Sequence, residues 1–171
     1  LVAAVGSYLD AKAHQGEWLV RIEDVDKPRA IPGAADTILT QLESHGLEWD
    51  GSVLYQSQRD STYQSQLDQL QKAELLYQCD CSRRAIRARN DHYDGYCRNR
   101  QPRTPPYALR FVNNAPITEF NDRAQGLLSD DSSSVSEDFV LKRRDGLYAY
   151  QLAVVVDDIE QGVTDIVRGR D

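Results

Sequence analysis

The chain has 171 residues, of which 40% are hydrophobic and 27% charged, a composition typical of a soluble globular protein. No apolar run approaches the roughly 20 residues of a membrane-spanning helix, which argues against a membrane partner. The formal net charge of −7 argues against indiscriminate binding to nucleic acid. Because the chain contains no Met and opens inside a predicted helix, we expect it to be a piece of a longer protein.

Helices and strands alternate in the first part of the chain, and apolar spacing defines them. The predicted elements are helices over 1–15, 32–46 and 63–75 and strands over 18–22 and 77–79. Gly16 and Gly46 are predicted to end the first two helices. This alternation favours a parallel α/β sheet with crossover helices for residues 1–78.

The pattern changes after residue 78. Residues 79–137 combine cysteines, arginines, prolines and a serine-rich loop, which predicts an insertion with its own small fold. Regular structure then resumes in residues 138–171, where an apolar run is followed by Asp157 and Asp158, which we expect to end it. The predicted strands of this half cover 108–112, 117–121, 139–141 and 164–168.

The charge of the chain is unevenly distributed. Residues 79–103 carry seven arginines against three aspartates, a local excess of four positive charges, so the remainder carries −11. A basic patch on an acidic body can meet phosphate groups, but an arginine-rich solvated face gives the same pattern. Composition therefore leaves both interpretations open.

Three cysteines, Cys79, Cys81 and Cys97, fall inside this basic segment. No secretory signal is visible in the sequence, so we expect a metal site in preference to a disulfide, with free buried cysteines as the alternative. Structural zinc takes four ligands, and imidazole is a common one. The nearby candidates for the fourth position are His92, Tyr93, Asp94 and Tyr96. Ligand chemistry alone favours His92.

Three acidic residues, Glu23, Asp24 and Asp26, follow the predicted strand over 18–22 at once. Ligands of open α/β sheets bind just beyond the carboxyl ends of strands, where acidic groups can hold an ammonium group or a metal. A solvated charged loop is the alternative for such a run.

Four motifs occur in this order: WLVRIEDVDKPR, YQSQR, CDC with YDGYC, and DFVLKRRDGLYAYQLAVVVDDIEQGVTDIVRG. Together they resemble the catalytic core of the class I glutamyl-tRNA synthetases. They are more similar to the shortened paralogous family, the glutamyl-queuosine tRNA(Asp) synthetases. The resemblance is weakest across 102–131. It implies a class I Rossmann-like parallel sheet core with a small zinc-bearing insertion.

The resemblance also implies an activity. The paralogous family activates glutamate with ATP and Mg²⁺ and transfers it to the queuosine base at the wobble position of tRNA(Asp). The family's His-x-Gly-His-like and Lys-Met-Ser-Lys-Ser-like ATP signatures do not occur here, so no catalytic residue is assigned. We therefore expect the isolated chain to be inactive. A cytoplasmic monomer is implied. The alternatives are an ordinary glutamyl-tRNA synthetase core and a non-catalytic zinc-dependent RNA-binding module.

Site residues follow from the resemblance by matching the motifs position by position. The implied contacts to L-glutamate are Glu23, Tyr150 and Arg168. A carboxylate suits the ammonium group, a phenol suits a hydrogen bond, and a guanidinium suits the carboxylate. The implied ligands of a structural zinc ion are Cys79, Cys81, Tyr93 and Cys97. Asp24 and Asp26 are expected to fix their loop through backbone and arginine contacts.

One position separates the two families. Where the glutamyl-tRNA synthetases resemble Y-H-L-A-N after the binding tyrosine, this chain has Tyr150 followed by Gln-Leu-Ala and Val154. Valine cannot replace the hydrogen bond of an amide, so we expect weaker binding of free glutamate, by roughly 1–3 kcal/mol. This departure is expected of the paralogous family.

Overall fold

The structure, a computed structural model, describes residues 1–90, 92–101, 104–130 and 132–169. The chain divides into two compact units, the first formed by residues 1–62 together with the chain from Ala153 onward, and the second by residues 63–152. The sequence-predicted insertion 79–137 lies within the second unit. Among the described residues, no helix combines the length and the apolar character needed to cross a membrane.

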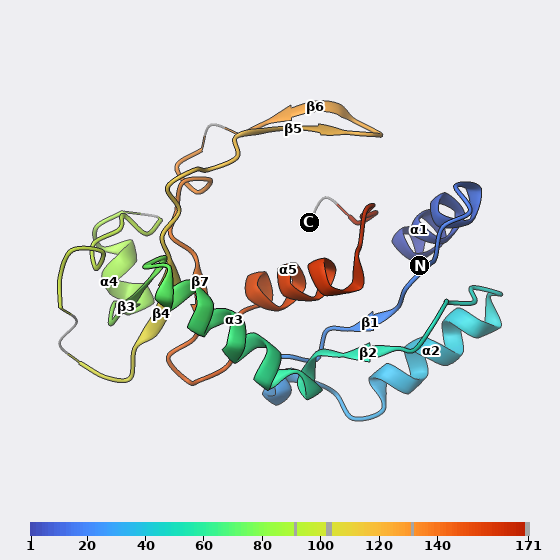
Figure 1. Ribbon diagram of the computed structural model, residues 1–171, viewed down its shortest axis with the longest axis horizontal. Helices are drawn as coiled ribbons and strands as arrows, with labels where there is room; N and C mark the ends of the chain where they lie inside the picture. Colours follow the sequence, from blue (N-terminus) through green and yellow to red (C-terminus); the bar gives the residue numbers. More distant parts are fainter. Residues whose placement is uncertain (91, 102–103, 131, 170–171) are drawn as a thin grey trace. The chain divides into compact units, whose positions relative to one another are not determined.

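The first unit contains a short parallel pair of strands. Its elements are α1 (Val2–Ala13), β1 (Arg21–Ile22), the 3-10 helix η1 (Lys27–Arg29), α2 (Ala34–Ser44), β2 (Leu54–Tyr55), the 3-10 helix η2 (Gln56–Gln58) and most of α5 (Tyr150–Gln161). Figure 1 shows β1 and β2 side by side. In their parallel ladder, Arg21 lies opposite Leu54 and Ile22 opposite Tyr55. The expected parallel pairing is present, but only between these two strands among the described residues.

The core of the first unit explains its helices. Trp18, Val20 and Leu47 are buried, and the apolar faces of α1 and α2 pack against them. Gly46 (φ +70°) ends α2 as predicted, since glycine adopts this left-handed conformation without strain. The prediction of Gly16 as the cap of α1 is wrong. Gln15 adopts the left-handed conformation instead (φ +57°), and the Gly16 N–H only closes the last turn.

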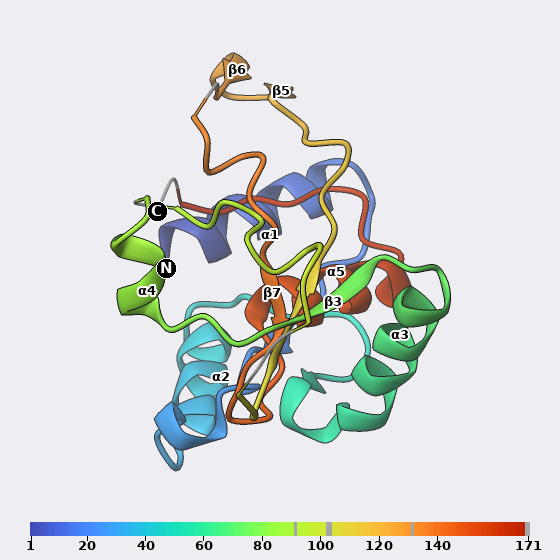
Figure 2. The same cartoon turned by 90° about the vertical axis from the view of Figure 1, so that its left-hand side faces the viewer.

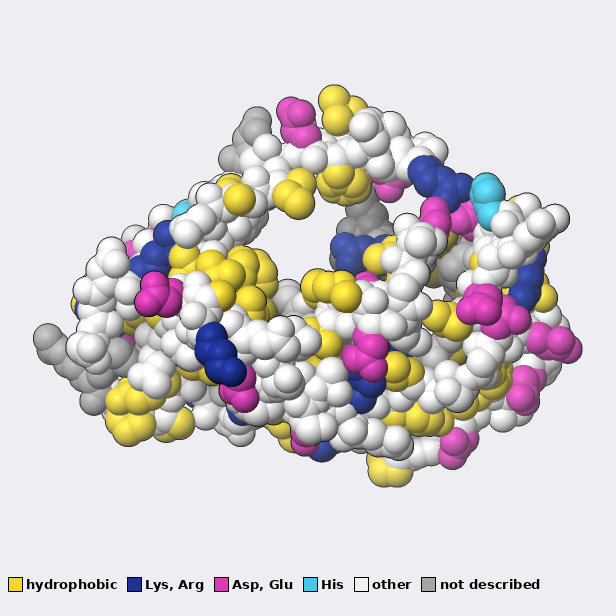
Figure 3. Space-filling model, viewed as in Figure 1, with side chains coloured by type: hydrophobic (Ala, Val, Ile, Leu, Met, Phe, Trp, Pro, Cys, Tyr) yellow, Lys and Arg dark blue, Asp and Glu magenta, His cyan; other side chains and the backbone are white. Residues whose placement is uncertain are grey.

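The second unit is built on antiparallel strands. Its elements are most of α3 (Asp60–Lys72), β3 (Leu76–Cys79), α4 (Arg83–Arg87), β4 (Ala108–Phe111), β5 (Glu119–Asp122), β6 (Gly126–Ser129) and β7 (Val140–Lys142). The order β3-β4-β7 forms one sheet, while β5 and β6 form a separate hairpin, visible at the end of the orange segment in Figure 2. Charged side chains of both signs are interspersed on the face shown in Figure 3.

Three further sequence predictions are wrong, each because contacts between residues distant in sequence decide the outcome. The strand over 77–79 pairs antiparallel with β4 and does not join a parallel layer. Residues 164–168 form no strand, since none of the strands in the described residues forms a ladder with them. The apolar run from Tyr150 continues through Asp157 and Asp158 as helix α5, because both carboxylates find arginine partners.

Candidate functional site

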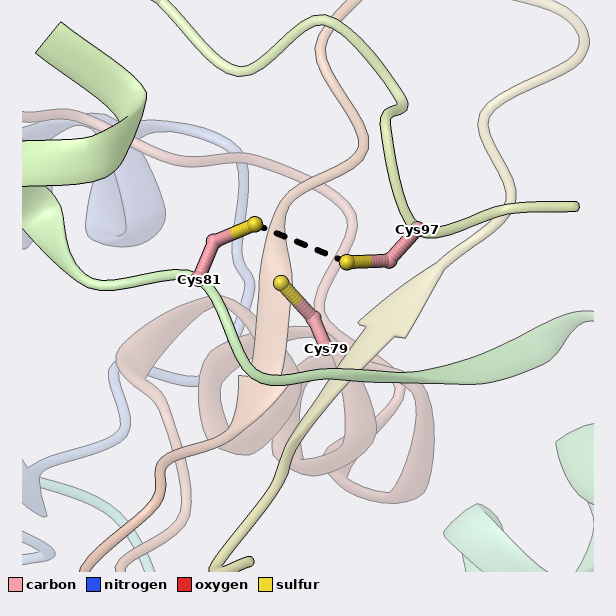
Figure 4. A group of neighbouring side chains, drawn as sticks. All are labelled: Cys79, Cys81 and Cys97. Carbon is pink, nitrogen blue, oxygen red and sulfur yellow. Dashed lines mark hydrogen bonds between the residues drawn. The ribbon is translucent and has the colours of Figure 1, made fainter. Parts of the chain in front are cut away.

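The three cysteines converge on one point in the second unit. Cys79 ends β3, Cys81 lies two residues further on, and Cys97 belongs to a separate loop. Their Sγ atoms all lie within 4.8 Å of one another, and those of Cys81 and Cys97 are 3.5 Å apart. Figure 4 shows the three side chains pointing toward one another. The chain therefore gathers three soft ligands at a position that can hold a metal ion.

Local backbone structure fixes two of these cysteines. Cys79 lies opposite Ala108 in the ladder between β3 and β4. Just after Cys81, Ser82 caps α4, because its Oγ accepts the N–H of Ala85 at 3.1 Å. The strand thus ends at the first cysteine of the CDC motif and the helix begins at Arg83, two residues after the second, so that both thiols lie in the short connection between them.

Tyr93 adjoins these thiols, whereas its neighbour His92 does not. Tyr93 is 2% exposed and packs in the buried cluster of the cysteines. Its hydroxyl oxygen accepts the backbone N–H of Cys97 at 2.8 Å. The ring nitrogens of His92 lie 2.9 Å from Ser133 Oγ and 3.2 Å from Asn90 Nδ2. The oxygen beside the sulfurs is therefore that of the phenol, and the imidazole is engaged with other partners.

Burial and hydrogen bonding act on the thiol pKa values in opposite directions. Burial raises the pKa of Cys79, but hydrogen bonds from the backbone and from Arg110 lower it below its usual value. At Cys81, burial and the neighbouring thiols raise the pKa despite a hydrogen bond from Arg89. A bound divalent cation favours the thiolate form of every such ligand, so the protonation of the cluster depends on its occupancy.

Asp138 connects the cysteine loop to the sheet. Its side chain is 2% exposed and receives hydrogen bonds from Arg98 Nε at 2.6 Å, Tyr77 Oη at 2.6 Å and the Asn113 N–H at 2.8 Å. Burial raises the pKa of this carboxyl, but the Arg98 cation and the hydrogen bonds outweigh burial and lower it. The buried carboxylate therefore joins β3, the loop after Cys97 and the start of β7.

The acidic residues after β1 divide into two kinds. Asp24 accepts the N–H and the hydroxyl of Ser57 at 2.8 and 2.6 Å, and Asp26 forms an ion pair with Arg29 at 2.7 Å. Their predicted role in fixing the loop is confirmed. The Glu23 side chain is exposed. Its carboxylate is thus accessible to a ligand at the edge of the strand pair.

The other two predicted contacts to glutamate lie on separate elements. Tyr150 is the first residue of α5 and is 47% exposed, so its ring is not a core side chain. Arg168 is exposed in the irregular chain that follows α5. Glu23 and Arg168 belong to the first unit and Tyr150 to the second. Val154, four residues after Tyr150 on the same helix, is half-buried.

A network of charged groups anchors α5 in the first unit, and the sequence did not predict it. Arg21 Nη1 donates to Asp158 at 2.7 Å. Asp157, which is fully buried, accepts hydrogen bonds from Arg59 Nε and Gln56 Nε2, each at 2.8 Å. One sequence signal could have indicated this network: the motifs RIED and QSQR each contain one of the two arginines, and the acidic pair Asp157-Asp158 follows later in the chain. These contacts hold β1 and η2 against the helix that begins at the candidate binding tyrosine.

The fold and these sites define a class of protein. Residues 2–171 match the family model described as "tRNA synthetases class I (E and Q), catalytic domain". The chain therefore belongs to this family of class I tRNA synthetases. The resemblance read from the sequence motifs and the expected class I synthetase fold of mixed α/β content are both confirmed.

Relatives refine this assignment. The chain is 86% identical over all 171 residues to "Glutamyl-Q tRNA(Asp) synthetase" of Idiomarina loihiensis and covers 60% of that protein. It is 53% identical to the protein of the same name from Escherichia coli K12 and covers 56% of it. Among solved structures, a glutamate tRNA ligase from Elizabethkingia meningosepticum in complex with its amino acid superposes with a TM-score of 0.78 at 26% identity, over 95% of this chain and 39% of the ligase. The chain thus spans 60% or less of the length of these relatives.

Proposed function

We propose that the protein containing this chain activates glutamate with ATP and Mg²⁺ and transfers it, through glutamyl-adenylate, to the queuosine base at the wobble position of tRNA(Asp). The observation that carries this proposal is the 86% identity, over the whole chain, to a glutamyl-Q tRNA(Asp) synthetase. Val154 supports it, since the polar residue of the glutamyl-tRNA synthetase motif is absent from that position.

Glu23, Tyr150 and Arg168 are the proposed contacts to L-glutamate. The Glu23 carboxylate would bind the ammonium group, and the guanidinium of Arg168 would bind a carboxylate of the substrate. The Tyr150 hydroxyl would supply a hydrogen bond. All three side chains are exposed, so each is accessible to a ligand. The loop after β1 is fixed by Asp24 and Asp26, whereas the Glu23 carboxylate, 3.4 Å from Arg21 Nη2, stays exposed for this role.

Cys79, Cys81, Tyr93 and Cys97 are the proposed ligands of a structural zinc ion. Zn–S bonds of about 2.3 Å place the sulfurs of a tetrahedral site about 3.8 Å apart. The observed separations, 3.5 Å for one pair and no more than 4.8 Å for any, fit such a site with small adjustments. When bound, the ion would cross-link β3 to the loop that carries Tyr93 and Cys97.

The partner of the insertion 79–137 is proposed to be tRNA. Helix α4 carries Arg83, Arg84 and Arg87, and all three are exposed. Like charges three and four residues apart repel on one helix, and phosphate groups relieve that repulsion. Arg103 lies outside the described residues. Residues 1–78 and 138–171 would form the catalytic core of a cytoplasmic monomer.

Transfer of labelled glutamate by the full-length protein tests the activity. We expect ATP-dependent labelling of tRNA(Asp) that contains queuosine and none of tRNA(Asp) that lacks it. Labelling of tRNA(Glu) at its terminal ribose would instead identify an ordinary glutamyl-tRNA synthetase. A protein that binds RNA without any glutamate-dependent exchange of pyrophosphate into ATP would be a binding module. Either outcome would refute the proposal.

A further inference from the structure

Arginine side chains contact the sulfur atoms of the cysteine cluster. Arg89 Nη2 lies 3.5 Å from Cys81 Sγ, and Arg100 Nη2 lies 3.4 Å from Cys97 Sγ. Both distances are within hydrogen-bonding range for sulfur, and in both the nitrogen is the donor. These two side chains are largely covered, with 29% and 25% of their surface exposed. Each of the two cysteines therefore has a guanidinium neighbour of its own.

The third sulfur has a guanidinium neighbour as well. Arg110 lies on β4, where Ala108 is paired with Cys79, and its guanidinium lowers the pKa of the Cys79 thiol. Its Cζ atom also lies 3.6 Å from the centre of the Tyr93 ring, and only 6% of the residue is exposed. Its Nη1 donates to the backbone carbonyl of Asp138, which fixes the plane of the guanidinium. One buried cation thus contacts the proposed ligand Tyr93 and acts electrostatically on a second, Cys79.

The aromatic ring of Tyr96 positions the two outer arginines. The Cζ atoms of Arg89 and Arg100 lie 4.2 and 4.4 Å from its centroid, within range of a cation–π interaction. Each arginine also has a carboxylate partner. Arg89 Nε lies 3.1 Å from Asp94, and Arg100 forms an ion pair with Asp80. The guanidinium groups are therefore held in place before any ion binds.

The negative charge of a zinc–thiolate site explains why arginines beside the cysteines would stabilise it. A zinc ion with three thiolates carries one net negative charge, and two if Tyr93 binds as a phenolate. Asp80 Oδ1 adds a further negative group 3.7 Å from Cys97 Sγ. Excess negative charge in a site of low polarity is costly unless cations and hydrogen-bond donors compensate it. Two guanidinium groups in direct contact with sulfur atoms, and a third stacked on the Tyr93 ring, supply that compensation.

We propose that Arg89, Arg100 and Arg110 form a cationic shell that stabilises the thiolate ligands and thereby sets the zinc affinity of this cluster. The inference rests on the proposed zinc site and extends it to residues that bind no metal themselves. Outer-shell groups that hydrogen-bond metal ligands typically change affinity by about 10- to 100-fold when removed. The donors here are ionised, which places them among the stronger hydrogen-bond donors.

Arginines of the same segment provide matched controls. Arg84 and Arg87 lie on α4, only a few residues from Cys81, and both are exposed. Neither contacts a sulfur atom in the part of the chain that the structure describes. Substitution of either one changes the net charge of the insertion as much as substitution of Arg89 does. The controls therefore separate direct contact with a thiolate from a general effect of charge.

Zinc affinity of the full-length protein tests the shell, by competition with a chromophoric chelator for the metal alone. Arg89→Gln and Arg100→Gln should each weaken zinc binding about tenfold. Arg84→Gln and Arg87→Gln should leave it within about twofold of the wild type. Tyr96→Ala should weaken binding, while Tyr96→Phe, which keeps the ring, should not. Circular dichroism of each variant shows that it is folded; Arg110 is omitted because its burial makes unfolding the expected result.

The outcomes distinguish the shell from the site itself. If the wild-type protein binds no zinc in a one-to-one ratio, the metal site and the shell are both refuted. If the wild type binds zinc tightly and Arg89→Gln and Arg100→Gln bind it equally well, the site stands and the shell is refuted. An equal loss in the α4 variants would attribute the effect to overall charge and would also overturn the inference.

Discussion

The two candidate sites of this chain differ in how they are held. The four metal-ligand candidates fall within 19 residues of sequence, and Cys79, Tyr93 and Cys97 are almost fully buried. The three glutamate candidates, in contrast, extend from Glu23 to Arg168, and each is exposed. The cysteine cluster is thus part of the interior of the second unit. The proposed glutamate contacts, in contrast, are surface side chains, and other residues hold the backbone that carries them.

This difference predicts how substitutions at each site affect stability and activity. Loss of a buried ligand removes packing and a cross-link, so it should lower stability first. Loss of an exposed carboxylate or guanidinium should lower binding and leave the free energy of unfolding nearly unchanged. Stability and activity can therefore separate the two sites.

Cys97→Ser is expected to have the largest effect on stability. It removes a proposed zinc ligand from the buried cluster, so we expect the full-length protein to lose at least about 3 kcal/mol of stability. Amide hydrogen exchange, which should become faster within residues 63–152, measures this loss. Chelation of zinc should destabilise the wild type similarly and leave the variant unaffected. A wild type that shows the same exchange with and without chelator would remove the structural role of the metal.

Glu23→Ala should lower activity and leave stability nearly unchanged, the opposite of the result expected for Cys97→Ser. Without the carboxylate that is proposed to bind the ammonium group, glutamate-dependent exchange of pyrophosphate should fall about 100-fold or more, while unfolding changes by less than about 0.5 kcal/mol. Glu17→Ala, at another exposed glutamate ahead of β1, is the matched control and should keep full activity. Exchange kinetics near those of the wild type would refute the role of Glu23.

Asp138→Asn tests the hydrogen-bonded support of the cysteine loop. Because the carboxylate is buried with Arg98 and Tyr77 as partners, the variant should be destabilised by about 2 kcal/mol at pH 7. The pKa of Asp138 is lowered in the folded state, so its contribution is complete above the unfolded pKa of about 3.9 and is lost as pH falls through the lower folded pKa.

Urea unfolding between pH 5 and pH 2 measures this contribution. The wild type should lose stability more steeply than Asp138→Asn across the acidic end of that range. Parallel curves for the two proteins would show that the carboxylate carries no pH-dependent stabilisation.

Val154→Asn is expected to have the smallest effect. The amide restores a polar group at the position that the glutamyl-tRNA synthetase motif fills with asparagine, so the KM for glutamate should fall by up to about fivefold, or about 1 kcal/mol. Val155→Asn is the control, since Val155 is 56% exposed and adjacent on α5. An equal fall in KM for both variants would show that position 154 has no specific role.

Local features of the fold were predictable from the sequence, and long-range pairing was not. Apolar spacing and Gly46 defined α2 correctly because helix hydrogen bonds close within four residues. The antiparallel pairing of β3 was not predictable, since its partner lies about 30 residues away and strand alternation does not record direction. The prediction of a strand over 164–168 was wrong because local apolar spacing does not show whether a pairing strand exists.

The candidate sites show the same contrast. The spacing of Cys79, Cys81 and Cys97 predicted a cluster, and their short separation in sequence favours such a convergence. The arginines that contact the sulfurs were visible only as an unexplained excess of charge. Arg110 could have been found from its place on β4, two residues after the buried Ala108, because alternate residues of a strand share a face.

X-ray absorption at the zinc edge of the full-length protein tests most directly whether the buried cluster is a metal centre. The ligand set Cys79, Cys81, Tyr93 and Cys97 predicts three sulfur atoms at about 2.3 Å and one oxygen at about 2.0 Å, without the multiple scattering of an imidazole ring. The oxygen shell should change in Tyr93→Phe and persist in His92→Ala. A spectrum with an imidazole signature, or with a shell of nitrogen and oxygen alone, would contradict the account.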